Sequence, residues 1–229
     1  MMPEADHLAS VLARARSTVT PVDGTTAPWP DMDAALASEV GASLCRLIGA
    51  EGSPYWKLGA TDVATQTRLG VPGPLFAPLD PASVRRDVVA ATLDRSTMIA
   101  PRFEPEIGVM WVDGVIFASP CVEIADCRFS GWRLPPWGVV ADATLQGEML
   151  FGPPVAPQDD VEVTVRLDGR EIGRGCGTWR EAVARLDLLP QEASAALVAT
   201  GSLTSLFDCE PGVWNFDFGP LGALTVSVV

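Results

Sequence analysis

Helical and strand-like patterns are separated along this chain, and their order constrains the fold more than any other feature. Residues 4–17 and 35–47 place apolar side chains at helical spacing, and Asp31 or Asp33 is suited to cap the second helix. Beyond residue 50, most apolar runs are rich in Val, Ile, Phe and Trp, as is typical of strands. Two N-terminal helices followed by a strand-dominated body predict an α+β fold.

The remaining pattern predicts how the body is divided. Strands are expected over 55–59, 102–117, 120–125 and 161–167, and a final pair over 213–229. Asp168-Gly169 predicts a tight hairpin, and the Pro- and Gly-rich stretch 70–81 predicts a loop. Short helices are expected over 179–189 and 191–198.

The charge of the chain limits its partners and its chemistry. It has 29 acidic and 16 basic residues, a formal net charge of −13, and such a chain repels the phosphates of nucleic acids and anionic lipid surfaces. Lys57 is its single lysine and His7 its single histidine. His-rich metal sites and Ser-His-Asp triads are therefore disfavoured. An enzyme with this composition is expected to use carboxylates, a metal ion or the one lysine.

The expected location of the protein is the cytoplasm. No stretch approaches the ~18 consecutive apolar residues of a membrane-spanning helix, and the N-terminus has acids before its apolar residues, unlike a secretory signal. The five cysteines are scattered without a C-x-x-C motif, which favours buried thiols in a reducing compartment. Neither a nucleic-acid partner nor a membrane partner is expected.

Three glutamates occur within strand-like, apolar sequence. Glu104 and Glu106 stand at the head of the strand predicted over 102–117, and residues i and i+2 of a strand project to the same face. Glu123 lies in the apolar strand 120–125. Unpaired buried carboxylates are unfavourable unless a cation or a proton compensates them. Convergent carboxylates suit Mg²⁺ or Mn²⁺; the alternative is a solvated Glu104–Glu106 face and a Glu123–arginine pair.

Lys57 is a candidate general acid or base. It lies between Trp56 and Leu58, so its ammonium group is expected to be partly buried. Burial lowers the pKa of a lysine toward neutrality, whereas neighbouring carboxylates raise it. Both outcomes stay open from the sequence, as does an ordinary solvated lysine.

A series of motifs in fixed order covers roughly residues 54–229. They are Tyr55-Trp56-Lys57-Leu58-Gly59-Ala60-Thr61, residues 66–71 (QTRLGV), 76–79 (FAPL), Glu104-Pro105-Glu106, 120–129 (PCVEIADCRF), Val140-Ala141-Asp142, 199–203 (ATGSL) and the 210–222 tail. Together they resemble the motifs YKIGLTS, Q..LGV, FGPL, EPE, PALEVVDSRF, VADN, LTGAL and PGD…GLG of the 2-keto-4-pentenoate hydratase and 4-oxalocrotonate decarboxylase family, in the fumarylacetoacetate hydrolase superfamily.

The resemblance implies a mixed β-roll with flanking helices. It implies an N-terminal helical segment over 1–50 and a β-roll of catalytic type over 51–229, as one structural domain, in a homodimer or a higher homo-oligomer.

The resemblance also implies a site and an activity. Mg²⁺ or Mn²⁺ would bind Glu104, Glu106 and Glu123. The substrate would be a small 2-oxo or 2-hydroxydienoic acid that chelates the metal through its carboxylate and 2-oxygen, in a hydratase or decarboxylase reaction. Lys57 matches the catalytic lysine of the family, Asp80 lies near the position of its acidic partner, and Asp142 falls in the segment that resembles VADN.

The chain departs from the family pattern in three places, one of which is residues 177–182 (GTWREA), where the family has GHPLNA. The spacing from Glu106 to Glu123 is shorter than in the family, and residues 131–143 replace most of its DWKIKxxDTVADN motif. Two alternatives to the lyase therefore stay open. One is a catalytically weak homologue that acts as a subunit or binding module, and the other is acylpyruvate hydrolysis or oxo-acid tautomerisation.

Overall fold

The computed structural model describes residues 3–190 and 195–229. Its helices are α1 (Glu4–Thr18), α2 (Ala34–Leu47), α3 (Val63–Leu69), α4 (Gly138–Ala141) and α5 (Trp179–Ala184). Its strands are β1 (Tyr55–Gly59), β2 (Leu75–Pro78), β3 (Val84–Arg85), β4 (Ala90–Leu93), β5 (Pro101–Val112), β6 (Val115–Asp126), β7 (Glu148–Phe151), β8 (Asp160–Leu167), β9 (Arg170–Thr178), β10 (Leu197–Ser202), β11 (Phe207–Asp208), β12 (Gly212–Asp217) and β13 (Ala223–Val228). The short 3₁₀ turns used below are η2 (Pro81–Ser83), η5 (Ala143–Leu145) and η6 (Arg185–Leu188).

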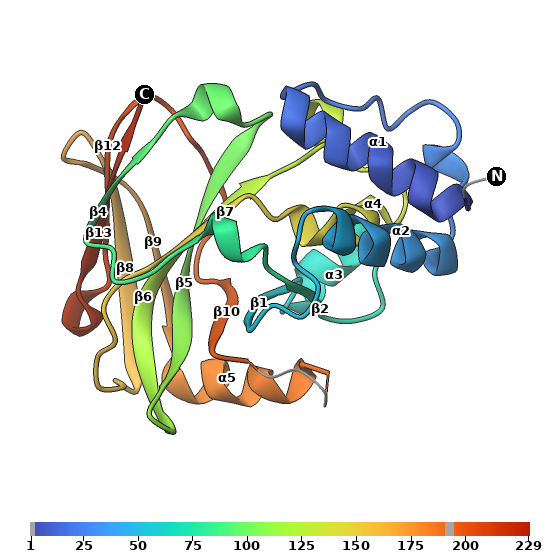
Figure 1. Cartoon of the computed structure of the whole chain (residues 1–229). Helices are drawn as coiled ribbons and strands as arrows, with labels where there is room; N and C mark the ends of the chain where they lie inside the picture. The colour runs from blue at the N-terminus through green and yellow to red at the C-terminus, as the bar shows by residue number, and fades with distance from the viewer. Residues whose placement is uncertain (1–2, 191–194) are drawn as a thin grey trace.

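The strands form two sheets that face each other (Figure 1). The larger sheet has the order β2-β1-β10-β5-β6-β7-β3, with β11 added to β5, and it contains parallel and antiparallel pairs. The smaller sheet has the order β4-β13-β12-β8-β9. The α+β fold predicted from the sequence and the mixed sheet implied by the resemblance are both confirmed.

An aromatic core joins the two sheets. Phe103 of β5 lies against Trp214 and Phe216 of β12, with ring centroids 4.9 and 5.1 Å apart. All three side chains are buried. Burial of large apolar surfaces is the dominant stabilising term in such a core. The packing of Phe103 therefore fixes β5 from the face opposite to Glu104 and Glu106.

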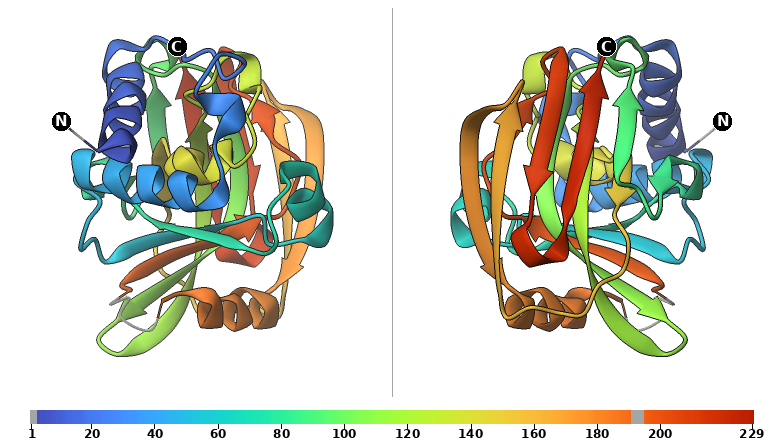
Figure 2. Two further views of the ribbon diagram at one scale, coloured as in Figure 1. Left: turned by 90° about the vertical axis from the view of Figure 1, so that its right-hand side faces the viewer. Right: turned by 90° about the vertical axis from the view of Figure 1, so that its left-hand side faces the viewer.

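The N-terminal helices cover the other side of the larger sheet. The two views in Figure 2 face the helical side and the side of the smaller sheet. Leu12 of α1 and Leu44 of α2 share a core with Phe129, which follows β6, and with Val139 of α4. Asp33 caps α2 by accepting a hydrogen bond from the Leu36 amide at 2.8 Å, one of the two caps predicted from the sequence.

Three predicted elements are corrected by the structure. The strand expected over 102–117 ends at Val112, and the chain turns at Asp113-Gly114 into β6. The loop expected over 70–81 contains β2. The helix expected over 191–198 is wrong at its end because β10 begins at Leu197, whereas residues 191–194 lie outside the described residues.

Within the described part of the chain, no helix has both the length and the apolar character required to cross a bilayer. All five cysteines are free thiols, and four of them are buried; Cys176 is exposed.

Candidate metal centre

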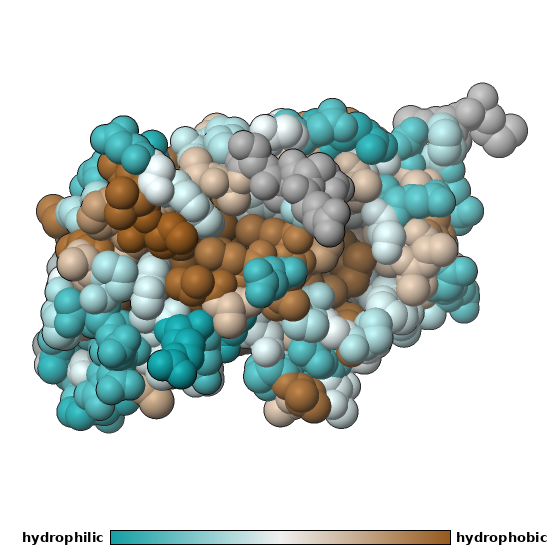
Figure 3. All heavy atoms as spheres, turned by 90° about the horizontal axis from the view of Figure 1, so that it is seen from below, coloured by the Kyte–Doolittle hydropathy of each residue, from teal (hydrophilic) through white to brown (hydrophobic). Residues whose placement is uncertain are grey.

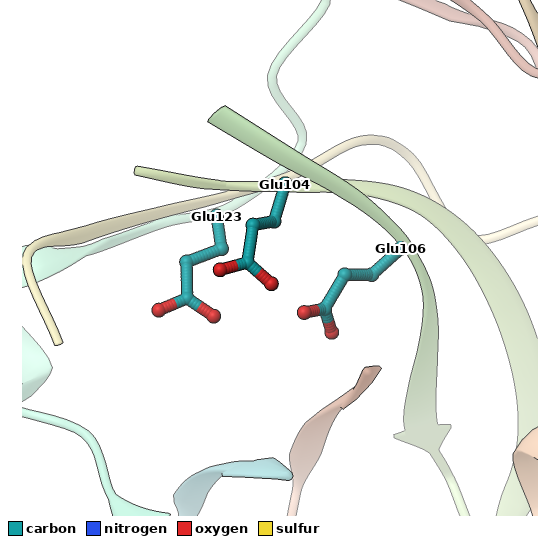
Figure 4. Close-up of side chains that lie close together, drawn as sticks. All are labelled: Glu104, Glu106 and Glu123. Carbon is teal, nitrogen blue, oxygen red and sulfur yellow. The ribbon is translucent and has the colours of Figure 1, made fainter. Parts of the chain in front are cut away.

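Three carboxylates converge between β5 and β6. Strand pairing places Glu104 directly opposite Glu123, and Glu106 follows two residues along β5 on the same face. One carboxylate oxygen from each side chain lies within 4.8 Å of the others, and Figure 4 shows the three groups pointing into one space. Glu106 and Glu123 are buried and Glu104 is half-buried. The alternative in which Glu104 and Glu106 lie on a solvated strand face is therefore wrong.

Two of these carboxylate oxygens have no donor in the described part of the chain. The Glu106 Oε2 atom accepts a hydrogen bond of 2.7 Å from the Gly201 amide, but Glu106 Oε1 and Glu123 Oε2 accept none although they are buried. Buried acceptors are nearly always satisfied in folded proteins. A cluster of unsatisfied carboxylate oxygens is a donor set that fits a hard divalent cation such as Mg²⁺ or Mn²⁺.

Lys57 enters the same site from β1. Its ammonium group donates to Glu123 and, at 2.7 Å, to the carbonyl oxygen of Thr144. Burial acts to lower the pKa of Lys57, but Glu123, Glu104 and Glu106 outweigh it, so the pKa is raised. The partner of Glu123 is thus the single lysine rather than an arginine.

A lysine lowers the pKa of a neighbouring solvated carboxyl group. The pKa values of these three glutamates are instead raised. Burial, followed by the charge of Glu123, raises the pKa of Glu104 to about 7, while Lys57 and Arg68 act against this rise. The pKa of Glu106 is raised well above its ordinary value by the same two causes and by Glu104. Three carboxylates share one ammonium group here, so a further positive charge would stabilise their ionised forms.

The carbonyl group that receives the lysine is aimed by an unusual turn. Ala143, Thr144 and Leu145 of η5 have φ angles of 47°, 58° and 63°, in the left-handed region that non-glycine residues seldom occupy. Arg128 supports this turn, because its guanidinium donates to the Gln146 carbonyl at 2.6 Å and pairs with Asp142 at 3.2 Å. Such strained backbone persists only where its surroundings hold it in place.

Asp80 and Asp142, the other two candidate catalytic residues, both pair with arginines. Asp142 is buried, accepts a hydrogen bond from the Arg128 amide at 2.9 Å and pairs with its guanidinium. Asp80 caps η2 and lies 3.8 Å from Arg16. Neither lines the cavity described next. The structure brings Lys57 to the three glutamates, whereas it pairs Asp142 with the buried Arg128 and Asp80 with the half-buried Arg16.

A cavity of about 720 Å³ opens onto the site. Lys57 and Glu104 lie in its wall, together with Thr144, Arg102 and the loop that follows β10. The single histidine, His7, is exposed on α1 and does not line it. Sequence reasoning missed Thr144 and Arg102. The Thr144 contact is made by a backbone atom and carries no side-chain signal, whereas Arg102 shares a strand face with Glu104 and Glu106 and could have been found by the same spacing rule.

Comparisons with known proteins agree with the motifs. No family model matches the chain. The chain is 26% identical to 4-oxalocrotonate decarboxylase from a Pseudomonas species over 90% of this chain and 89% of that protein. It is 24% identical to 2-keto-4-pentenoate hydratase from Burkholderia vietnamiensis over 77% of this chain and 76% of that protein.

Solved structures show the same fold. The structure of 4-oxalocrotonate decarboxylase from Pseudomonas putida, complexed with magnesium and adipate, matches all of this chain and 99% of that one with a TM-score of 0.85 at 21% identity. Fumarylpyruvate hydrolase from Pseudomonas aeruginosa, in complex with Mn²⁺ and pyruvate, matches 76% of this chain and 88% of that one with a TM-score of 0.55 at 16% identity. The resemblance inferred from the motifs is confirmed: the chain is similar to 4-oxalocrotonate decarboxylase and 2-keto-4-pentenoate hydratase and has the fold of the fumarylacetoacetate hydrolase superfamily.

Proposed function

We propose that this protein is a metal-dependent lyase of the hydratase or decarboxylase type, acting on a small 2-oxo or 2-hydroxydienoic acid. The observation that carries the proposal is the buried group of Glu104, Glu106 and Glu123 beside Lys57, at the wall of a cavity. Two proteins similar to this chain are a decarboxylase and a hydratase, and structures with the same fold are complexed with magnesium or Mn²⁺.

The chain supplies the metal ligands and a proton carrier. A Mg²⁺ or Mn²⁺ ion held by the three glutamates would act as a Lewis acid toward the carboxylate and 2-oxygen of the substrate. The Lys57 ammonium has three donors, of which two are used by Glu123 and Thr144. We propose that the third N–H faces the cavity and exchanges a proton between the 2-oxygen and the carbon chain of the substrate.

The surroundings of Lys57 suit this task. Thr144 and Glu123 fix the position of its nitrogen, so little reorganisation is needed when a proton moves. Leu69, Leu134 and Leu145 also line the cavity. These apolar side chains would exclude water from the diene and strengthen the electrostatic interactions beside it.

An ultraviolet absorbance assay with 2-hydroxypenta-2,4-dienoate, with and without Mg²⁺ or Mn²⁺, tests the proposal. We expect loss of the diene absorbance only when a divalent ion is present. The purified protein would also be titrated with Mn²⁺ by calorimetry. Metal binding without turnover of any dienoate or acylpyruvate would support the binding-module alternative, and turnover of acylpyruvates alone would support the hydrolase alternative.

We further propose a homo-oligomer, which is the expected assembly. The face seen from below carries a band of hydrophobic residues (Figure 3). The turn of the β5–β6 hairpin and helix α5 lie at this end of the molecule (Figure 1). Val115, the first residue of β6, and Leu188, the last residue of η6, are 55% and 37% exposed. A second copy of the chain would cover such a surface. Sedimentation velocity of the wild type and of Val115→Glu tests this assembly.

The cytoplasmic location expected from the sequence stays a prediction.

A further inference from the structure

A second cavity, of about 590 Å³, lies beside the η5 turn and is called the apolar cavity below. Residues of α2, α4, β2 and η5 line it, and these segments lie close together in the fold (Figure 1). Leu75 and Thr144 line both the apolar cavity and the cavity that opens onto the glutamates. The η5 turn and the start of β2 therefore form a wall that the two cavities share.

The lining of the apolar cavity carries no charge. Among the residues that the structure describes, those that line it include no Asp, Glu, Lys, Arg or His, whereas basic side chains line the neighbouring cavity. Its two hydroxyl groups are already used, because Ser38 donates to the Ala34 carbonyl at 2.8 Å and Thr144 donates to the Ala143 carbonyl at 2.7 Å. An ion is unfavourable in such surroundings, so the cavity selects an uncharged ligand.

Three aromatic side chains shape the space inside it. Trp56 and Phe76 form a tilted pair with ring centroids 6.4 Å apart, and Trp137, the residue before α4, adds a third ring. Aromatic rings of a ligand pack favourably against such faces and edges. The volume lies within the range of about 300–1,000 Å³ that is typical of small-molecule sites. The lining therefore indicates a neutral aromatic molecule.

Strained backbone surrounds the apolar cavity. Trp137, Ala143 and Thr144 all line it, and their φ angles are 60°, 47° and 58°, in the left-handed region that non-glycine residues seldom occupy. Strained residues of this kind cluster at ligand clamps and switch regions, where their surroundings hold them. Arg128 holds the η5 turn through the Gln146 carbonyl. On the side of the cavity, the turn borders a space that a ligand can fill.

The same turn positions Lys57, since the Thr144 carbonyl accepts a hydrogen bond of 2.7 Å from its ammonium group. A ligand packed against Ala143 and Thr144 restricts the turn and keeps this carbonyl in place for Lys57. We propose that the apolar cavity is an effector site for a neutral aromatic molecule, whose binding raises turnover at the glutamate site through η5. The effect on turnover rests on the proposed function, whereas the binding of the ligand does not.

Fluorescence titration with two dyes that share one ring skeleton tests the binding site. N-phenyl-1-naphthylamine is neutral, and 1-anilinonaphthalene-8-sulfonate adds a single sulfonate to it; both dyes emit more strongly in apolar surroundings. We expect the neutral dye to bind the apolar cavity at least about tenfold more tightly than the sulfonate does. Equal or tighter binding of the sulfonate at this cavity would overturn the inference.

Two alanines of α2 identify where the dye binds. Ala42 is exposed and lines the apolar cavity, so Ala42→Phe fills part of it. Ala35 is exposed on the same helix and lines neither cavity, so Ala35→Phe is the matched control. The affinity for the neutral dye should fall at least about tenfold in Ala42→Phe and stay unchanged in Ala35→Phe. Equal affinities in the two variants would place the dye on another surface and overturn the inference.

Turnover of 2-hydroxypenta-2,4-dienoate in the presence of Mn²⁺ tests the effector role. It is measured by liquid chromatography because the dye also absorbs ultraviolet light. The neutral dye at saturation should raise kcat of the wild type at least about twofold with KM unchanged, and the same dye concentration should not activate Ala42→Phe. Binding of the dye without a change in kcat would overturn the effector role. Absence of turnover with and without the dye would overturn the proposed function and the effector role with it, whereas dye binding that Ala42→Phe abolishes would still support the binding site.

Discussion

Lys57 donates a hydrogen bond to Glu123 in the interior of the protein, where the two side chains are only 5% and 1% exposed. The pair joins β1 to β6, two strands that are not neighbours in the sheet. Breaking a buried ion pair by removing one partner leaves an uncompensated charge and is strongly destabilising. Lys57 and Glu123, which are proposed to act in the reaction, therefore also stabilise the metal-free protein.

The first prediction concerns Lys57→Met. This change removes the proposed proton carrier while keeping an unbranched side chain of similar length, so kcat on the dienoate should fall about 10²- to 10⁴-fold. Removal of a positive charge beside the three glutamates should leave Mn²⁺ affinity unchanged or increase it. Steady-state kinetics and Mn²⁺ calorimetry check these outcomes together. Loss of Mn²⁺ binding in parallel with kcat would instead assign Lys57 a structural role.

The local elements of the fold could be predicted from sequence because short-range patterns determine them. The α1 helix, the Asp33 cap and the hairpin at Asp168-Gly169 all occur where expected. The turn at Asp113-Gly114 was missed although it has the same dipeptide, because apolar residues continue on both sides of it. The β2 strand was missed because Pro74 precedes it and Pro78 is its last residue. It lies at the edge of the sheet, where proline is tolerated.

The site could be predicted only in part, because its geometry depends on contacts between distant segments. Alternation along a strand placed Glu104 and Glu106 on one face. Their meeting with Glu123 depends on the β5–β6 register, which the two-residue turn at Asp113-Gly114 fixes. Because that turn was missed, the complete set of three ligands came from the family resemblance. The Thr144 carbonyl depends on a left-handed turn of three non-glycine residues, a conformation that sequence propensity disfavours.

The second prediction concerns the proposed metal ligands. Glu106→Gln keeps the size of the side chain and removes one negative charge from the three carboxylates. Mn²⁺ affinity should therefore fall at least about tenfold, and most of the increase in turnover rate on addition of Mn²⁺ should be lost. Calorimetry and the absorbance assay measure both effects. The matched control is Glu162→Gln on the exposed face of β8, which should change neither. Wild-type metal affinity in Glu106→Gln would contradict the proposed site.

The third prediction is a pH dependence of the metal-free protein. The pKa of Glu104 is raised from 4.5 to about 7 in the folded chain, so the native state binds more protons than the unfolded state between these values. The stabilisation from this group is complete below pH 4.5 and is lost as the pH rises through 7. The melting temperature of the metal-free wild type should therefore decrease from pH 6 to pH 8 more steeply than that of Glu104→Gln.

Metal binding should reverse this dependence. Ligation requires ionised carboxylates, so Mn²⁺ affinity should increase as the pH rises toward 8 and binding near pH 6.5 should release protons. Calorimetry in two buffers with different ionisation enthalpies counts the released protons. Uptake of protons, or an affinity independent of pH, would be inconsistent with a raised Glu104 pKa.

The fourth prediction concerns Gly201, whose amide donates to Glu106. Its φ angle is 100°, and a Cβ atom would lie 2.6 Å from the Thr61 hydroxyl oxygen. Gly201→Ala therefore combines backbone strain of about 1–2 kcal/mol with a steric clash, and relief of the clash would displace the amide from Glu106. Gly114→Ala, at the β5–β6 turn with a φ of 79° and no atom near the added Cβ, carries the strain without the clash. Mn²⁺ affinity should fall in Gly201→Ala and stay unchanged in Gly114→Ala. Combining Gly201→Ala with Thr61→Ala removes the two atoms nearest to the added Cβ and should recover part of the lost Mn²⁺ affinity. Equal Mn²⁺ affinities in all three variants would show that the Gly201 amide does not position Glu106.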